Sequence, residues 1–360
     1  MEQVKKDIRK FTLQELEDFF VTQGDKKFRA KQVYDWLWNK SLKNFDDMSN
    51  ISKETREMLK DNFSINHVKV DLMQHSTDGT IKNAVKLHDG KIVESVLIPT
   101  TKRITACVSS QVGCSLDCNF CATARLKRMR NLNPDEIYDQ VVAIKEEAET
   151  YFNRPLTNIV FMGMGEPLLN YANVVDAIDK ITSPEGLGMA PRRITLSTVG
   201  IPKMIRKMAD DEVKFNLAIS LHSAINETRS RLMPINDVNP LEDLADSLRY
   251  WYQKTKRKVT YEYVIWDGIN DDQAHAKALA KFCKIIPSKV NIIQYNPIDE
   301  GEFRQAKQEA VDMYIRVLEA QGIIAKVRKS RGQDIDAACG QLANKNEVAE
   351  LEGGISLKNS

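Results

Sequence analysis

The sequence predicts an α/β fold, organised as a partial (β/α)6 TIM-like barrel that carries two smaller additions at its amino-terminal side. From about residue 104 onward, six apolar strand-like runs alternate with amphipathic helix-like runs. Strands separated by single helices pair in parallel, and six such units suit an incomplete barrel. An open, doubly wound sheet is the alternative. Residues 1–66 instead show helical periodicity, and residues 67–100 show period-two alternation.

The first addition is a helical module over residues 1–66. Its first helical run begins at Thr12, has Glu15 at the spacing of a capping box and ends at Gly24. Two more helical runs follow, over residues 26–40 and 52–63.

The second addition, residues 67–100, is predicted to be a small antiparallel β extension. Apolar and polar residues alternate over 68–76, 80–88 and 91–99. The dipeptides Asp78-Gly79 and Asp89-Gly90 separate these runs and are typical of tight hairpin turns.

The barrel itself is predicted over residues 101–343, followed by a tail over 344–360. Its first helix is indicated by Asn133, Pro134 and Glu136, and the last helical run covers residues 302–322, ending at Gly322. The six strand runs are 104–110, 158–164, 193–199, 214–222, 259–266 and 290–296. In parallel barrels the loops after the carboxyl ends of the strands form the working site, so the polar tips of these runs should face one pocket.

Composition limits the class of protein. The 360 residues are 42% hydrophobic and 28% charged, which is typical of a globular chain. No stretch approaches the roughly 20 apolar residues of a membrane span, so we expect a cytoplasmic protein without membrane contact. The net charge is only +2, so any binding of nucleic acid depends on local basic runs. Such runs are 124–130, 190–193, 254–258 and 326–331.

Three cysteines follow the first barrel strand, Cys114, Cys118 and Cys121, in a C-x3-C-x2-C pattern with Phe120 before the last. A structural zinc site needs four protein ligands, and the sequence offers no suitable second pair nearby. A [4Fe-4S] cluster held by three cysteines leaves one iron open to an external ligand. That iron can chelate the amino and carboxylate groups of S-adenosylmethionine, whose reductive cleavage yields a deoxyadenosyl radical.

Other strand ends carry groups that suit this ligand. Glu166, in "GMGEP", could accept hydrogen bonds from its ammonium group. Ser197, Ser220, His222 and Asn296 could bind its carboxylate, ribose and adenine.

Two further cysteines stand outside the cluster motif. Cys107 lies on the strand that leads into the cluster loop, and Cys339 lies in an apparent loop between small residues that leave its sulfur accessible. Cys283 lies in a predicted amphipathic helix, so we expect it to be a buried apolar residue.

Together these motifs resemble the radical S-adenosylmethionine family that methylates carbon 2 of adenosine in bacterial ribosomal and transfer RNA. The resemblance runs from about residue 90 to 343. It rests on the cluster motif and on "VESVLIP", "CVSSQVGC", "FMGMGEPLLN", "RRITLSTVG", "ISLH", "LMPIN", "YNP" and "DIDAACGQLA".

The resemblance implies roles for individual residues. Cys339 receives a methyl group from one S-adenosylmethionine, and a second supplies the radical that activates this methyl for addition to carbon 2. Cys107 then resolves the protein–RNA adduct by forming a disulfide with Cys339, and Glu94 matches the proton acceptor. The cofactor contacts carried over are Gly165, Glu166, Ser197, Ser220, Leu221, His222 and Asn296.

The implied substrates are an adenosine of 23S rRNA at the peptidyl-transferase centre and the adenosine beside the tRNA anticodon. The implied partners are these RNAs and an electron donor, a flavodoxin-type reductant, and we expect a monomer. Phosphate contacts are expected from the basic runs, above all Arg125–Arg130, and from the N-terminal helices. Three alternatives remain: a sister group that methylates carbon 8 of a ribosomal adenosine, a non-catalytic iron–sulfur RNA-binding protein, and a radical enzyme acting on a small molecule or peptide.

Overall fold

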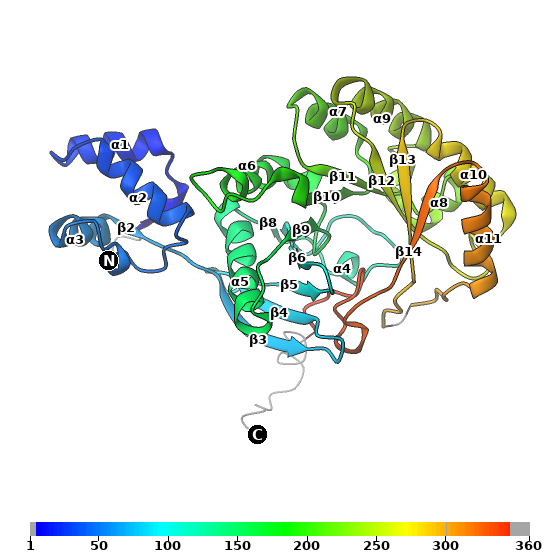
Figure 1. Ribbon diagram of the computed structural model, residues 1–360, viewed down its shortest axis with the longest axis horizontal. Coiled ribbons are helices and arrows are strands. Elements are labelled where there is room, and N and C mark those ends of the chain that lie inside the picture. The colour runs from blue at the N-terminus through cyan, green and yellow to red at the C-terminus, as the bar shows by residue number, and fades with distance from the viewer. Residues whose placement is uncertain (1–4, 300, 346–360) are drawn as a thin grey trace.

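The computed structural model describes residues 5–299 and 301–345, which form a ten-stranded mixed sheet, helices around it and a helical lobe at one side (Figure 1). The strand order is β14-β13-β12-β11-β10-β9-β6-β5-β4-β3. The seven strands from β14 to β6 are parallel, and β6, β5, β4 and β3 are antiparallel neighbours. The sheet curves but does not close, so the partial barrel predicted from the sequence is confirmed.

The barrel strands and their helices alternate along the chain. The strands are β6 (Ile104–Cys107), β9 (Asn158–Phe161), β10 (Ile194–Thr198), β11 (Asn216–Ser220), β12 (Val259–Val264), β13 (Ser288–Ile293) and β14 (Ile324–Arg328). The helices between them are α5 (Pro134–Phe152), α6 (Tyr171–Thr182), α7 (Pro202–Asp210), α8 (Asn226–Leu232), α9 (Leu241–Thr255), α10 (Gln273–Cys283) and α11 (Gln308–Glu319).

Two features of the barrel differ from the sequence prediction. β14 is a seventh parallel strand that overlaps the basic run 326–331. Apolar and basic residues alternate from Ala325 to Arg328, which conceals an edge strand in a charged stretch. The last helix begins at Gln308, because residues before it hydrogen-bond to the loop after β12: Asp267 N donates to Arg304 O (3.0 Å).

The antiparallel extension consists of β3 (Lys69–His75), β4 (Ile81–Lys86) and β5 (Ile92–Pro99). It continues the sheet beyond β6, with Val96 opposite Cys107. The Asp-Gly turns lie where the sequence predicts them, and Gly79 and Gly90 have positive φ (84° and 83°). The extension thereby brings Glu94, on its inner strand, close to the start of the barrel.

The N-terminal lobe contains α1 (Leu13–Thr22), α2 (Phe28–Trp38) and α3 (Lys53–Asn62), with a short parallel pair of β1 (Lys6–Asp7) and β2 (Phe63–Ser64). The predicted capping box is present, because Glu15 N donates to Thr12 Oγ1 (3.2 Å) and Thr12 N donates to Glu15 Oε2 (2.7 Å). The lobe docks on α5, where buried Arg9 pairs with Asp139 (2.7 Å) and Asp135 (3.4 Å).

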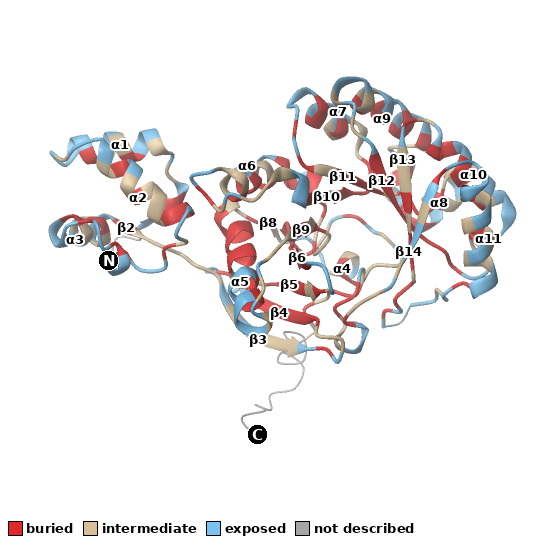
Figure 2. Ribbon diagram, viewed as in Figure 1, coloured by how far each residue is buried: buried red, intermediate tan, exposed pale blue. Residues whose placement is uncertain are grey.

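The core lies between the sheet and its helices. Figure 2 shows buried residues concentrated on the middle strands and on the sheet-facing side of α5. Among the described residues, no helix is both long and apolar enough to cross a membrane.

One buried carboxylate gives a stability prediction. Glu147 of α5 accepts a hydrogen bond from Asn83 Nδ2 (2.7 Å), but its second oxygen has no partner in the described structure. Burial raises the pKa of Glu147 to about 7. Because the pKa of Glu147 is higher in the folded protein than in the unfolded chain, ionisation of this carboxyl lowers the free energy of unfolding. This loss of stability grows as the pH rises from 4.5, the ordinary pKa of the carboxyl, to about 7.

We therefore expect Glu147→Gln to raise the free energy of unfolding by about 2 kcal/mol at pH 8 and to change it little below pH 4. Denaturant titrations at both pH values measure this difference. Glu149→Gln is the matched control, since Glu149 is exposed on the same helix. An equal effect of the two substitutions would contradict the prediction.

Candidate active site

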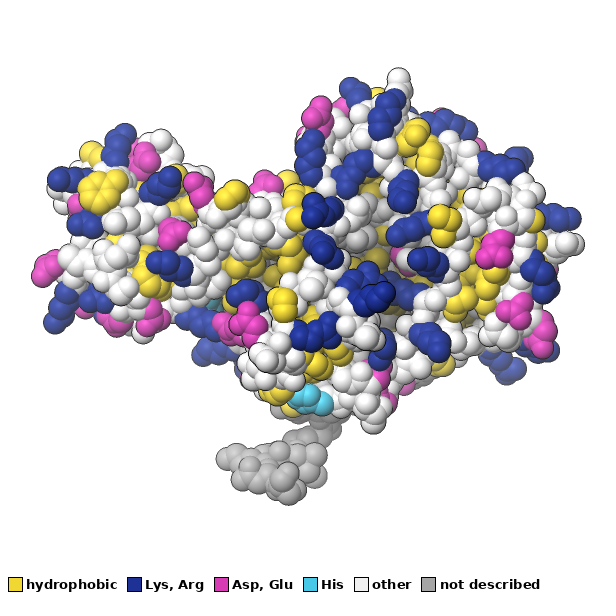
Figure 3. Space-filling model, in the orientation of Figure 1, with side chains coloured by type: hydrophobic (Ala, Val, Ile, Leu, Met, Phe, Trp, Pro, Cys, Tyr) yellow, Lys and Arg dark blue, Asp and Glu magenta, His cyan; other side chains and the backbone are white. Residues whose placement is uncertain are grey.

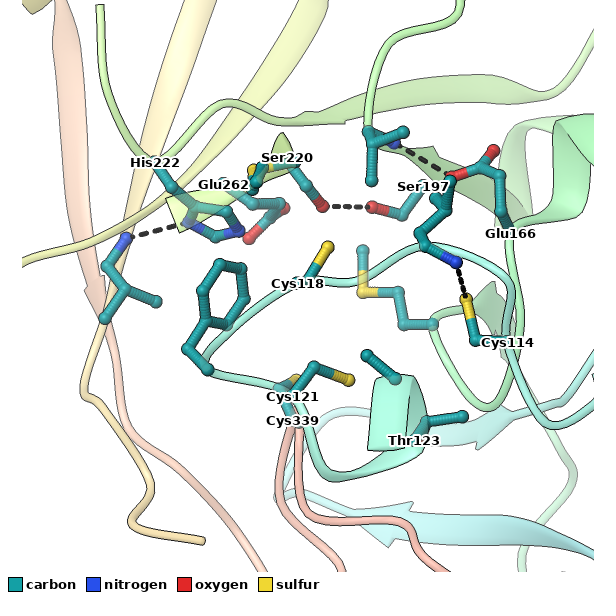
Figure 4. A pocket seen from close by; sticks show the side chains of 18 of the residues that line it. Cys114, Cys118, Cys121, Thr123, Glu166, Ser197, Ser220, His222, Glu262 and Cys339 are labelled. Carbon is teal, nitrogen blue, oxygen red and sulfur yellow. Dashed lines mark hydrogen bonds between the residues drawn. The ribbon is translucent and has the colours of Figure 1, made fainter. Parts of the chain in front are cut away.

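The three clustered cysteines lie in one loop at the carboxyl end of β6. The loop is framed by a two-residue pair of β7 (Gln111–Val112) and β8 (Arg130–Asn131), and α4 (Ala122–Arg125) begins directly after Cys121. All three cysteines line a cavity at the carboxyl ends of the barrel strands, which we call the first cavity (Figure 4). Burial is the main cause that raises the pKa of each thiol, that of Cys114 to about 11. The protein alone therefore keeps these thiols protonated, and a cationic ligand would be needed to hold them as thiolates.

Most of the predicted cofactor contacts also line this cavity. They are Gly165, Glu166, Ser197, Ser220, His222 and Asn296, and they come from the ends of four strands, β9, β10, β11 and β13. Figure 4 shows Ser197 and Ser220 on the wall opposite Cys121, with their hydroxyl oxygens 3.4 Å apart. Leu221 is the exception, because it is fully buried and does not line the cavity. Its N–H donates to Glu262 O (3.0 Å) and its carbonyl accepts from Arg229 Nε (3.2 Å).

Glu166 is fixed by the backbone around it. Its carboxylate accepts from Leu168 N and Val199 N, both at 3.0 Å, and its residue is only 3% exposed. Burial raises the pKa of this carboxyl, and the backbone donors act in the opposite direction. The preceding Gly165 has φ +92°, and a Cβ there would lie 2.5 Å from Gln111, so only glycine fits this turn.

His222 is a neutral group in the cavity wall. Its Nδ1 accepts a hydrogen bond from Val264 N (3.2 Å), and burial, with a smaller effect of Arg229, lowers its pKa to about 3. Its ring packs edge-on against Phe120 (centroids 4.9 Å apart). A neutral, apolar-packed ring of this kind suits the binding of an uncharged aromatic group such as adenine.

Two functional candidates in this region were not found from the sequence. Glu262 of β12 lines the first cavity and is 4% exposed. Its Oε2 accepts no hydrogen bond in the described structure and lies 3.8 Å from Arg328 Nη1. Arg229 is fully buried and donates to Val199 O (2.5 Å), after β10, and to Leu221 O (3.2 Å), after β11, which fixes two strand ends. The inward face of β12 could have indicated Glu262, since polar residues at period two on a buried strand point into the barrel.

Cys339 lies between the first cavity and a second one. The second cavity is lined by residues that include Thr105, Cys107, Met162, Arg328 and Cys339. Both thiols are free, and Cys107 is buried whereas Cys339 is exposed. Burial raises the pKa of Cys107 to about 12. The structure thus brings Cys107 and Cys339 together, although they are 232 residues apart in the sequence.

The loop that carries Cys339, residues 332–344, is held on both sides of the thiol. Asn296 Nδ2 donates to Cys339 O (3.2 Å), and Ala122 N donates to Gly340 O (2.7 Å). At the carboxyl end of the loop, Glu94 accepts from Ala343 N (2.8 Å) and Asn344 N (3.1 Å).

Glu94 is therefore not an outward-facing strand carboxylate. It is 1% exposed and pairs with Lys82 Nζ (3.2 Å), which is also buried. It lines neither the first nor the second cavity. Its implied role as proton acceptor stays a prediction.

Comparison with known proteins places this site in a family. Residues 6–65 match the model of the ribosomal RNA large subunit methyltransferase N-terminal domain, and residues 108–280 match the radical SAM superfamily. The chain is 68% identical to a Christiangramia forsetii protein named "Probable dual-specificity RNA methyltransferase RlmN", over 95% of this chain and 97% of the relative. It is 67% identical to a Flavobacterium johnsoniae protein of the same name, over 95% and 98%. The chain belongs to this methyltransferase family.

A solved structure supports the fold of this family member. The crystal structure of a radical SAM methyltransferase from Sphaerobacter thermophilus superposes with a TM-score of 0.88 at 37% identity, covering 94% of this chain and 99% of the other. The family resemblance drawn from the sequence is thereby confirmed, as is the expectation of an S-adenosylmethionine-dependent enzyme with a [4Fe-4S] cluster.

The residues present fit these two cofactors. Among the described residues, no three His, Cys, Asp or Glu side chains form a site for a single metal ion. A cubane cluster instead takes one thiolate at each of three irons, as Cys114, Cys118 and Cys121 around one cavity can provide. The remaining cavity wall offers carboxylate, hydroxyl and amide groups for the polar parts of S-adenosylmethionine.

Proposed function

We propose that the chain methylates carbon 2 of adenosine in 23S rRNA and in tRNA, with Cys339 as the methyl carrier. The observation that supports this most directly is the position of Cys339 and Cys107. Both thiols line the second cavity, and Cys339 alone of the two also lines the first. A thiol between a cofactor cavity and an adjoining cavity can accept a group on one side and present it on the other.

The need for a radical follows from the substrate. Carbon 2 of adenine is an electron-poor amidine carbon, so it does not attack a sulfonium methyl group as a nucleophile. When bound, the cluster and S-adenosylmethionine supply both the methyl group and the radical chemistry.

The chain's own residues hold the reacting groups. Cys114, Cys118 and Cys121 hold the cluster, and the residues of the first cavity bind the cofactor. Cys339 carries the methyl, and Cys107 lies beside it to release the product by forming a disulfide. The disulfide is two electrons more oxidised than the two free thiols, so a reductant must restore both thiols in each cycle.

We further propose that this reductant is a flavodoxin-type electron donor and that the enzyme acts as a monomer in the cytoplasm, where ribosomal and transfer RNA are found. A monomer can be checked by light scattering of the purified protein.

The deciding experiment is nucleoside mass spectrometry on protein-free 23S rRNA and on tRNA. The anaerobically reconstituted protein is incubated with each RNA, S-adenosylmethionine and a reductant. We expect 2-methyladenosine in both. 8-Methyladenosine would instead place the chain with the carbon-8 enzymes, and absence of any product from a protein with an intact cluster would contradict the proposal.

A further inference from the structure

Four cations lie together at the amino ends of the barrel strands, on the side opposite to the cysteine loop. Arg103 directly precedes β6, Lys258 directly precedes β12, Lys289 is the second residue of β13, and Lys326 is in β14. Because side chains alternate along a strand, Lys258 is on the same face of β12 as Glu262, and Lys326 is on the same face of β14 as Arg328. These four residues, called here the amino-end cation cluster, therefore lie at the barrel opening that the amino ends of the strands form.

The members of the cluster are close enough to repel one another. Burial is the main cause that lowers the pKa of Lys289; Lys258, Lys326 and Arg103 lower it further, and Glu262 acts in the opposite direction. Within residues 5–299 and 301–345, none of the four has a carboxylate within 4.0 Å. Glu262 is the carboxylate that acts on Lys289, but it forms no ion pair with any of the four within this distance. Like charges gathered without ion pairs cost free energy unless an anionic partner binds there.

The basic run at 124–130, which the sequence favoured for RNA contacts, has different surroundings. Arg130 is paired with Asp89 (2.8 Å) and with Glu136 (2.7 Å). Arg125 donates to Asp299 O. Arg128 donates to Asn131 Oδ1 (3.4 Å). Three of the four cations of this run are thus engaged within the protein, in contrast to the amino-end cation cluster.

The second cavity reaches from one member of the amino-end cation cluster, Arg103, to the thiols. Arg103 lines this cavity, together with Arg328, Lys329 and Arg331, and the same cavity reaches Cys107 and Cys339. Figure 3 shows Lys and Arg side chains gathered over the β10–β14 region and around the hollow beside it, with few acidic side chains among them. A positively charged opening therefore leads to the proposed methyl carrier.

We propose that the amino-end cation cluster binds phosphates of the RNA strand on either side of the target nucleotide, and that the target base reaches Cys339 through the second cavity. This inference rests on the proposed function, because it takes RNA as the substrate. A base in folded RNA must be unpaired or turned out of its stack to enter such a cavity, and phosphate contacts at the rim hold the strand while it does so. An acidic protein partner would use the same charges but would have no need for a cavity that ends at the two thiols.

The test compares two triple variants of the reconstituted full-length enzyme. The first, Lys258→Gln, Lys289→Gln and Lys326→Gln, removes three members of the cluster. The control, Lys203→Gln, Lys277→Gln and Lys281→Gln, removes three lysines of α7 and α10 that are exposed and have no carboxylate within 4.0 Å in the described structure. Binding of a tRNA anticodon stem-loop is measured by fluorescence anisotropy across a range of salt concentrations.

We expect the cluster variant to bind on the order of 100-fold more weakly at 0.1 M salt, and the slope of log affinity against log salt to fall by about 2. The control should keep the wild-type slope. A third variant with Arg at all three cluster positions keeps the charge and should keep most of the slope, which excludes a folding defect as the cause. Equal slopes in the cluster variant and the control would overturn the proposal.

The rate of Cys339 methylation, measured by intact-protein mass spectrometry, distinguishes a failure of this proposal from a failure of the proposed function. This methylation needs no RNA, so all variants should methylate Cys339 at the wild-type rate. If wild-type protein methylates RNA but the variant that lacks Lys258, Lys289 and Lys326 binds RNA unchanged, only the role of the amino-end cation cluster is wrong. If wild-type protein neither binds nor methylates RNA, the proposed function itself fails, and with it this inference.

Discussion

Replacing Cys339 with alanine is expected to reduce methyladenosine formation at least 1000-fold while leaving the fold and the cluster intact. The Cys339 side chain has no hydrogen-bond partner in the described structure, and the loop is held there through backbone carbonyls: those of Cys339 and Gly340 accept from Asn296 and Ala122. Alanine preserves both contacts and removes only the sulfur. Without a thiol to accept the methyl group, electron-poor carbon 2 has no methyl donor that it can use.

Three measurements check this prediction. Nucleoside mass spectrometry follows the RNA product, intact-protein mass follows methylation of the enzyme, and the visible absorbance of the cluster reports its integrity. Cys283→Ala is the matched control, because Cys283 is a free thiol that is buried in α10 and lines neither cavity. Wild-type turnover by the Cys339 variant would rule out the methyl-carrier mechanism and favour a cluster with another role.

The cysteine loop and the order of the barrel could be predicted from the sequence because their signals are local. Three cysteines within eight residues define a cluster motif whatever the rest of the chain does. The strand and helix periodicities of the barrel are likewise read within windows of 10 to 20 residues. The position of the strand ends then follows from parallel topology, and it correctly brought Ser197, Ser220 and Asn296 into one cavity.

The features that could not be predicted depend on register or on distant pairs. Lys258, Lys289 and Lys326 come from separate strands, and only the register of β12, β13 and β14 brings them together. The basic run 124–130 stood out in the sequence, yet the sequence could not show that Asp89, from the turn after β4, neutralises Arg130. Two members of the amino-end cation cluster, Lys258 and Lys326, belong to basic runs that the sequence does show, but only the fold places them beside Lys289 and Arg103.

Glu94 shows how the same difficulty affects a functional residue. The family resemblance implies a role for Glu94, but that role depends on which groups the Glu94 carboxylate contacts. In this structure the carboxylate accepts from two consecutive N–H groups beyond Cys339 and pairs with buried Lys82. These contacts indicate a positioning residue that holds the Cys339 loop over the first cavity.

We expect Glu94→Gln to slow methylation of Cys339 about 10- to 100-fold. The substitution leaves Lys82 as a buried cation without its partner, at a cost of about 3 kcal/mol, and the loop end is the part that can move to relieve it. Intact-protein mass measured over time, without RNA, gives the rate. Asp71→Asn, an exposed carboxylate of the same extension, is the control and should have no effect.

A proton acceptor at this position predicts the opposite pattern. Its loss would leave Cys339 methylation at the wild-type rate and would block only the release of methylated RNA. The double variant Lys82→Met, Glu94→Gln makes the distinction sharper, because it removes the unpaired cation and keeps an amide oxygen that can accept from Ala343 and Asn344. If Glu94 acts by holding the loop, this variant should recover most of the methylation of both Cys339 and RNA; if Glu94 takes up a proton, RNA methylation should stay blocked, since an amide cannot replace a carboxylate as a base.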